Sequence, residues 1–184
     1  MLRDIFFVIW FFLPAGLGNA APIIAAKVPV LKSWSYPLDG YVTFHGKRLF
    51  GDHKTVRGLV SGTFTGMLTA SLQVVLYNEV SIVREAISLD YSQINPLLFG
   101  ALAAFGALTG DALKSFFKRQ CNIAPGASWF PFDQIDYVIG GIVFTAFYIR
   151  LSLPQYLLLF LIWTVLHPIA TFVGYTLKLK AHPI

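Results

Sequence analysis

Long apolar stretches are the feature that most constrains what this chain can fold into. They cover residues 5–26, 58–77, 96–109, 135–150 and 153–177. A helix needs roughly 20 apolar residues to cross the hydrocarbon core of a bilayer. With a mean hydropathy of +0.66 and 12% charged residues, the 184-residue chain carries too little polar surface for a soluble domain of its size.

The stretches predict an all-α polytopic membrane protein. We expect a bundle of five transmembrane helices that forms a single domain over residues 1–184, with two cytoplasmic loops at about residues 27–57 and 119–135. The first loop contains Gly, Pro and aromatic residues, which favours an ordered loop over a linker. The third helix is expected to continue beyond its apolar part as far as Arg119.

Lysine and arginine are distributed unevenly, and this predicts the orientation. Six of them lie in the first loop, three lie at the end of the third span and in the loop after it, and Lys178 and Lys180 follow the fifth span. The loops expected on the opposite side carry only Arg84 and Arg150. Cytoplasmic loops are enriched in these residues. We therefore expect a protein of the cell (inner, cytoplasmic) membrane, with its N-terminus outside the cell and its C-terminus in the cytoplasm.

Glycines recur at a spacing of four residues in two of the spans. Gly58, Gly62 and Gly66 share one face of the second span, and Gly106 and Gly110 repeat the spacing in the third. Small residues in this pattern let helix backbones approach closely in lipid. The glycines therefore predict a compact bundle, and they do not indicate a particular function.

The remaining composition excludes some classes of site and partner. Cys121 is the only cysteine, so an intrachain disulfide and a cysteine-based metal cluster are both excluded. The net charge of +5 alone would suit nucleic acid, but the hydropathy argues against that partner. The basic residues are expected to face membrane phosphates, a phosphorylated substrate or the cytoplasm.

A basic cluster precedes the second span. Its members are Lys47, Arg48, Lys54 and Arg57, with Thr55 at the expected helix start. Cations and helix N-terminal N–H groups both bind phosphate oxygens, so the cluster predicts a polyphosphate site, although the spacing of a Walker A loop is absent. The alternative is a set of positive charges that only orients the span.

A second cluster lies at the end of the third span. Asp111, Lys114, Ser115 and Lys118 are spaced i, i+3, i+4 and i+7, so they share one face of a helix. A carboxylate near the membrane boundary needs a partner or a cavity. The alternative to a functional role is a salt bridge between Asp111 and Lys114.

Two further carboxylates open the fourth span. Asp133 and Asp136 form an i, i+3 pair that suits a divalent cation, and the alternative is helix capping. Together with Asp111 and the nearby cations, they suit Mg²⁺-assisted phosphoryl or nucleotidyl transfer. Asn19, inside the first span, is expected to contact either a substrate head group or another helix, and His167 before Pro168 is expected to mark a kink.

Several blocks, in this order along the chain, resemble the CDP-archaeol synthase family. The blocks are Asn19-Ala20-Ala21-Pro22, Pro37-Leu38-Asp39, the run from Arg48 to Gly58, Gly110-Asp111, Ser115-Phe116-Phe117-Lys118-Arg119, Pro125-Gly126-Ala127 and the run from Pro131 to Asp136. Members of this family are membrane cytidylyltransferases that use CTP, and they are distantly related to CDP-diacylglycerol synthases. The resemblance covers nearly the whole chain.

The resemblance implies a reaction in which a lipid phosphate attacks the α-phosphorus of CTP, releasing pyrophosphate and leaving a CDP-lipid for phospholipid biosynthesis. It implies Mg²⁺ held by Asp111, Asp133 and Asp136, which with Lys118 form the expected catalytic set. The residues expected to bind CTP, its phosphates or the lipid phosphate are Lys47, Arg48, Lys54, Thr55, Arg57, Lys114, Ser115 and Arg119, with Asn19 near the lipid head group.

The expected acceptor is archaeal-type 2,3-di-O-geranylgeranylglyceryl phosphate or a related lipid. One alternative is phosphatidic acid, as for a CDP-diacylglycerol synthase. An alternative of another class is a non-enzymatic small transporter or assembly factor, but a transporter would show internal repeats with broken helices, and the sequence has none. Expected partners are CTP, the lipid phosphate and the bilayer, and a homo-oligomer is left open.

Overall fold

The structure, a computed structural model, describes residues 2–124 and 126–178. The helices are α1 (Leu2–Ala25), α2 (Pro29–Lys32), α3 (Val56–Glu79), α4 (Ser81–Ala86), α5 (Pro96–Gln120), α6 (Phe132–Ala146) and α7 (Leu153–Thr176), and Tyr91–Gln93 forms the 3-10 helix η1. Strand β1 (Thr43–Phe44) pairs antiparallel with β2 (Lys47–Arg48). Pro125 and Lys180, which entered the sequence predictions, lie outside the described residues.

Helices α1, α3, α5 and α7 are long and apolar enough to cross a membrane. They confirm an all-α, multi-pass membrane protein. The fourth predicted span is present as α6, but its 15 residues make a helix about 22 Å long. The hydrocarbon core is roughly 30 Å thick. The five spans and the orientation of the termini therefore stay predictions.

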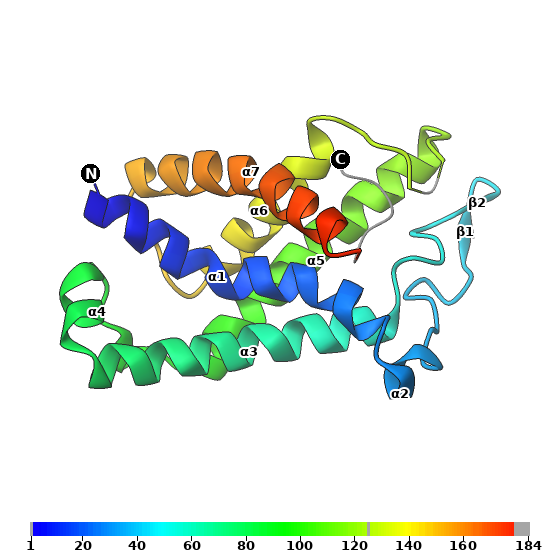
Figure 1. The fold of residues 1–184 in the computed structure, drawn as a ribbon. Coiled ribbons are helices and arrows are strands. Elements are labelled where there is room, and N and C mark those ends of the chain that lie inside the picture. The colour runs from blue at the N-terminus through cyan, green and yellow to red at the C-terminus, as the bar shows by residue number, and fades with distance from the viewer. Residues whose placement is uncertain (1, 125, 179–184) are drawn as a thin grey trace.

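Successive long helices run in alternating directions. In Figure 1, α1, α5 and α7 run from the end that carries the N-terminus toward the end that carries the β1–β2 hairpin, and α3 and α6 run back. The β1–β2 hairpin and the C-terminal end of α5 therefore lie at the same end of the bundle, and α4 lies at the other. This alternation brings the two charged clusters of the sequence together.

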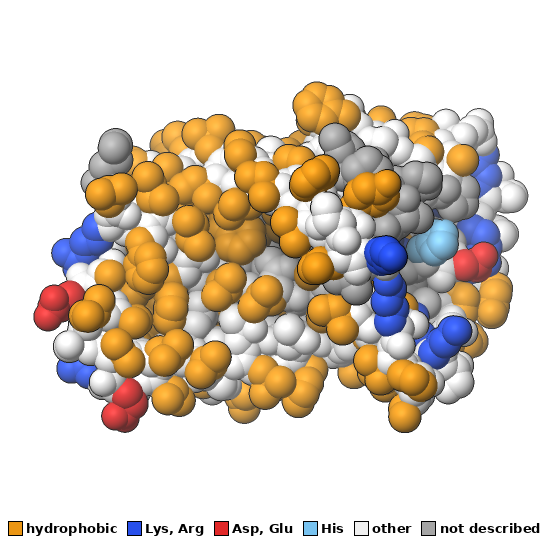
Figure 2. Space-filling model, in the orientation of Figure 1, with side chains coloured by type: hydrophobic (Ala, Val, Ile, Leu, Met, Phe, Trp, Pro, Cys, Tyr) orange, Lys and Arg blue, Asp and Glu red, His pale blue; other side chains and the backbone are white. Residues whose placement is uncertain are grey.

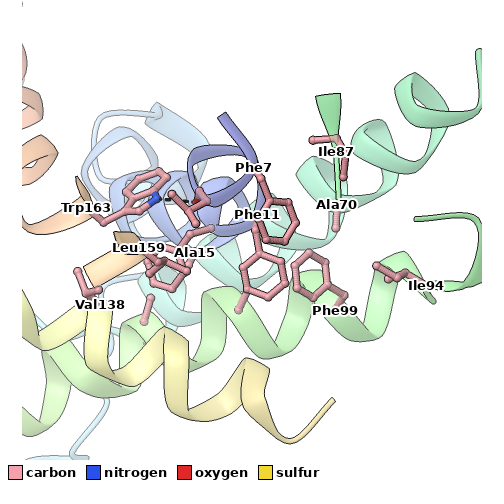
Figure 3. Close-up of a cluster of buried hydrophobic side chains, with 14 of the residues drawn as sticks. Phe7, Phe11, Ala15, Ala70, Ile87, Ile94, Phe99, Val138, Leu159 and Trp163 are labelled. Carbon is pink, nitrogen blue, oxygen red and sulfur yellow. Dashed lines mark hydrogen bonds between the residues drawn. The ribbon is translucent and has the colours of Figure 1, made fainter. Parts of the chain in front are cut away.

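The buried core is built around α1 (Figure 3). Phe7 and Phe11 are almost fully buried, and the ring of Phe11 lies 5.1 Å from that of Phe99 in α5. On the other side of α1, Trp163 of α7 donates an indole N–H to the carbonyl oxygen of Val8 at 3.1 Å. Because lipid is as apolar as these side chains, close packing and such hydrogen bonds hold the helices together.

The predicted glycine stripes do bring helix backbones into contact. A Cβ added at Gly62 would lie 2.5 Å from the carbonyl oxygen of Gly18 in α1. One added at Gly66 would lie 2.5 Å from the carbonyl oxygen of Gly100 in α5. A methyl group has no room at either contact, so α3 packs closely against both α1 and α5, and the prediction of a compact bundle is confirmed.

The outer surface has an apolar middle and charged ends. On the face shown in Figure 2, hydrophobic side chains cover α7, α1 and α3, and the acidic and basic side chains gather at the two ends. Exposed residues of α3 and α7 include Phe64, Leu68, Leu157 and Leu161. This distribution is the one expected of helices that face lipid along their length.

The first loop is folded around the carboxylate of Asp39, whose side chain is 0% exposed. Its oxygens accept from the Arg48 guanidinium at 2.6 and 3.2 Å and from the backbone N–H groups of Phe50 and Gly51, each at 3.0 Å. Burial opposes ionisation, but the Arg48 guanidinium and these N–H groups lower the pKa of Asp39 to about 2. The loop is therefore ordered next to the start of α3, where Lys54 and Thr55 lie.

Candidate active site

A polar cavity of about 730 Å³ lies at the end of the bundle that carries the first loop. Helices α1, α3, α5, α6 and α7 all contribute to its wall. Its volume falls in the range of roughly 300–1,000 Å³ that is typical of small-molecule sites. The ionisable residues that line it are Asp52, His53, Lys54, Arg57, Asp111, Lys114, Lys118, Arg119, Asp133, Asp136 and His167.

Three carboxylates converge on the ammonium group of Lys114. Its Nζ lies 3.0 Å from Asp111 Oδ1, 3.0 Å from Asp133 Oδ1 and 2.7 Å from Asp136 Oδ2. Asp111 precedes Lys114 by one turn of α5, and the other two carboxylates come from the first turns of α6. The structure therefore brings together all three predicted metal ligands, and they surround a lysine.

Two more lysines hold the outer sides of this group. Lys54, from the loop before α3, pairs with Asp111 Oδ2. Lys118 donates to both oxygens of Asp133, at 2.8 and 3.0 Å, and to the carbonyl oxygen of Ala127 at 2.7 Å. Because an ammonium has three N–H groups, these contacts occupy Lys118 fully and attach the segment after α5 to the start of α6.

Glycines set the distance between α5 and α6 at the carboxylates. A Cβ added at Gly110 would lie 2.2 Å from the carbonyl oxygen of Asp136, and one added at Gly140 would lie 2.2 Å from that of Gly106. The backbones can be this close only because neither position has a side chain. The same contact places Asp111 beside Asp136.

The donor chemistry of this group suits a hard divalent cation, because carboxylate oxygens are the ligands that Mg²⁺ prefers. Among the described residues, however, no set of three His, Cys, Asp or Glu side chains is arranged to hold a metal ion as it stands. The Nζ of Lys114 lies at the point that the three carboxylates share. The three carboxylates are ligands of the type that Mg²⁺ prefers. A metal ion that binds all three would have to replace the Lys114 ammonium.

Two residues of the predicted phosphate site do not line the cavity. Lys47 donates to the carbonyl oxygen of Gln120 at 2.7 Å, which attaches the hairpin to the end of α5. Arg48 is paired with Asp39 and Asp52 and lies over the ring of Tyr41. Both residues organise the loop here, and their predicted contact with phosphate has no support in this geometry.

Other predicted residues do line the cavity while serving the fold. Arg57 donates to the carbonyl oxygens of Leu31 and Lys32, and the Thr55 hydroxyl accepts from the N–H of Gly58 as the N-cap of α3. Ser115 donates its hydroxyl to the carbonyl oxygen of Asp111. These contacts give Arg57, Thr55 and Ser115 structural roles, and their predicted contacts with CTP or a lipid phosphate stay predictions.

Some buried polar atoms in the cavity wall have no hydrogen-bond partner among the described residues. They include Nε of Arg119 and Oε1 of Gln134. Buried polar groups in proteins are nearly always paired with protein groups or with water, so these atoms in the cavity wall can accept a polar ligand or water as a partner. Arg119, which was predicted to contact phosphate, is available to do so.

Polar residues of α7 were missed as site residues. His167 and Thr171 both line the cavity, and Pro168 lies between them. From the sequence, His167 was expected to mark a kink before Pro168. Their spacing of four residues on an otherwise apolar span puts them on one helix face, and this signal could have identified them.

A second, apolar pocket of about 240 Å³ lies between α1 and α7. It is lined by residues such as Ala20, Ile24, Leu166 and Ala170. Asn19, Ile23, His167 and Thr171 line both this pocket and the polar cavity. The charged cavity therefore shares part of its wall with an apolar pocket between two membrane helices, which defines a multi-pass membrane protein with an intramembrane polar site.

Comparison with known proteins identifies the family. The CarS-like, CDP-archaeol synthase family matches residues 1–184. The CDP-archaeol synthase of Methanospirillum hungatei is 33% identical over 178 residues, which cover 93% of this chain and 99% of that protein. The CDP-archaeol synthase of Thermococcus kodakarensis is 32% identical over 185 residues, with 99% of this chain and 98% of that protein covered.

A solved structure shares the fold. It concerns an intramembrane enzyme for archaeal membrane lipid biosynthesis, and it superposes with a TM-score of 0.69 at 27% identity over 88% of this chain and 90% of that one. The chain belongs to the CDP-archaeol synthase family. It is a CTP-dependent cytidylyltransferase of lipid biosynthesis, and the resemblance drawn from the sequence is confirmed.

Proposed function

We infer that this enzyme transfers CMP from CTP to 2,3-di-O-geranylgeranylglyceryl phosphate or a closely related archaeal lipid phosphate. An oxygen of the lipid phosphate attacks the α-phosphorus of CTP, the bond from that phosphorus to the β-phosphate breaks, and pyrophosphate leaves. The observation that carries the proposal is the wall that the charged cavity shares with the apolar pocket between α1 and α7. One substrate is a soluble nucleotide and the other is a lipid, and this site offers surfaces for both.

The lipid phosphate enters from the side of α1 and α7 in this proposal. Its chains occupy the apolar pocket, and its phosphate reaches the polar cavity past Asn19 and Thr171, which line both. A polar side chain inside a membrane span is costly unless it faces a cavity or a partner. The position of Asn19 therefore supports its predicted place near the lipid head group.

The triphosphate of CTP binds at the loop side of the cavity. Arg119 offers an unpaired N–H there, and Lys54 lies in the cavity wall next to the N-terminus of α3. Cations and helix N-terminal N–H groups suit phosphate oxygens. Two anionic substrates repel each other, so the positive groups between them lower the barrier to attack.

Mg²⁺ is part of the proposal, held by Asp111, Asp133 and Asp136. When bound, the ion would neutralise charge that develops on the phosphates during transfer. The chain's own contribution is to hold the carboxylates in one place, through the close contact of α5 with α6 and through Lys54 and Lys118. These residues orient the groups that face the reacting phosphates.

In the same proposal α6 is a fifth, short span, the N-terminus is outside and the enzyme resides in the cytoplasmic membrane. Asp111 lies nine residues before the end of α5, or about 13 Å along the helix. A short α6 begins at this depth, and that is how Asp133 and Asp136 meet Asp111. Local thinning of the bilayer or tilting of neighbours accommodates short spans at modest cost.

The test is CDP-lipid formation by purified enzyme with the two acceptors side by side. We expect product from 2,3-di-O-geranylgeranylglyceryl phosphate with CTP and Mg²⁺, at least tenfold less from phosphatidic acid, and none after chelation of the metal. Equal or better use of phosphatidic acid would instead assign the enzyme to the CDP-diacylglycerol branch. Full activity with a chelator present would refute the role of Mg²⁺.

A further inference from the structure

The Lys114 ammonium lies among three carboxylates of the site, and the side chain is 13% exposed. Its ammonium has three N–H groups, and three carboxylates lie within 3.0 Å of it. The contact with Asp111 is a hydrogen bond, and those with Asp133 and Asp136 are ion pairs, so the ammonium faces carboxylates on three sides. The geometry therefore gives Lys114 another role than the phosphate contact expected from the sequence.

The three carboxylates depend on Lys114 to different degrees. Asp111 also pairs with Lys54, and Asp133 also pairs with Lys118. For Asp136, Lys114 is the only lysine or arginine within ion-pair distance among residues 2–124 and 126–178. Three carboxylates this close repel one another unless a cation lies between them.

A divalent cation and the Lys114 ammonium would use the same oxygen atoms. Mg²⁺ and its analogue Mn²⁺ bind carboxylate oxygens at about 2 Å, and the ammonium already lies at the point these oxygens share. The second oxygens of Asp111, Asp133 and Asp136 are already engaged by Lys54, Lys118 and the backbone N–H of Tyr137. A metal ion that binds all three carboxylates therefore competes with the Lys114 ammonium for the oxygens that face it.

We propose that Lys114 is a resident cation that holds Asp111, Asp133 and Asp136 together and withdraws when a divalent ion binds. This inference rests on the proposed metal site and adds a step to it. Lys114 acts through the carboxylates and is a positioning residue.

The first test measures Mn²⁺ binding to the whole enzyme at pH 8 by electron paramagnetic resonance, without CTP or lipid acceptor. Lys114→Met keeps the length of the side chain and removes its charge. We expect this variant to bind Mn²⁺ about tenfold more tightly than the wild type, because the ion no longer competes with a buried ammonium. Lys32→Met, which changes an exposed lysine of α2, should leave the affinity unchanged.

A second measurement uses the wild-type chain, so it does not depend on the variant's folding. Acetylation of lysines is followed by mass spectrometry with and without Mn²⁺, with Lys32 as the internal reference. We expect Lys114 to be protected without the metal and to become several-fold more reactive with it.

The outcomes separate this inference from the proposed function. Two results would overturn the role of Lys114 and leave the metal site standing. The first is Mn²⁺ binding by the wild type without a gain in the reactivity of Lys114, and the second is an Mn²⁺ affinity of Lys114→Met that is unchanged or weaker. If neither the wild type nor Lys114→Met binds Mn²⁺, both the proposed metal site and the role of Lys114 are overturned.

Discussion

At the scale of single residues, Asp39 shows how a buried carboxylate orders a polar loop. It lies outside the cavity, yet it organises the segment that leads to Lys54 and Thr55. The sequence placed Asp39 in a family block but gave it no role, because its partners, from Tyr41 to Gly51, are brought to it only by the folded loop. Arg48 was assigned to phosphate for the same reason.

The stability of this loop depends on pH because the pKa of Asp39 is lowered in the folded loop. Asp39 has a pKa of about 2 in the folded loop against 3.8 when free. Its contribution to stability is therefore complete above about pH 4 and is lost as the pH falls toward 2. Asp39→Asn removes the ion pair with Arg48 at every pH, and charge-assisted hydrogen bonds contribute roughly 1.5–3 kcal/mol each.

We expect pepsin to cleave the loop about tenfold faster in Asp39→Asn than in the wild type at pH 4–5. The difference should disappear near pH 2. Asp52→Asn is the matched control, since that side chain is 78% exposed and makes one contact with Arg48. Equal cleavage of Asp39→Asn and wild type at pH 5 would show that Asp39 does not hold the loop.

At the scale of elements, the contact of α5 with α6 builds the site. The spacing of Asp111, Lys114, Ser115 and Lys118 predicted one helix face, and α5 is continuous through all four. The glycine pattern predicted close packing. Neither pattern could show that α6 begins beside Asp111, because the depth of a short helix is set by its neighbours. The backbone that Gly110 contacts belongs to Asp136, which lies 26 residues further along the chain.

Gly140→Ala tests this contact. The added methyl group would lie 2.2 Å from the carbonyl oxygen of Gly106, so the helices must separate. Overpacking of this kind costs roughly 1–3 kcal/mol, and it moves Asp136 away from Asp111. We expect a thermal midpoint several degrees lower and at least tenfold slower turnover.

The control for Gly140→Ala is Ile139→Ala on the same helix, where the side chain is 47% exposed. That change should have little effect on either quantity. A Gly140→Ala enzyme with the stability and turnover of the wild type would show that the backbone contact does not position the carboxylates.

At the scale of the whole molecule, alternating helix directions place both charged clusters at one end of an apolar bundle (Figures 1 and 2). Hydropathy was sufficient to predict this class of protein, since long continuous apolar stretches suit helices, which satisfy their own backbone hydrogen bonds within lipid. It could not show the apolar pocket between α1 and α7, because the pocket forms only where residues far apart in the sequence, such as Ile24 and Leu166, meet in the folded bundle. The spacing of His167 and Thr171 marks one face of α7, and the structure adds that this face borders both the pocket and the charged cavity.

The central claim is that a membrane-borne phosphate attacks the α-phosphorus of CTP in the shared cavity. The most direct measurement compares CTP radiolabelled at the α-phosphate with CTP radiolabelled at the γ-phosphate, each incubated with enzyme, Mg²⁺ and the archaeal lipid phosphate. We predict that the α-label enters the lipid fraction and that the γ-label stays in the aqueous phase as pyrophosphate. Transfer of the γ-label to lipid, or of neither label, would contradict the account.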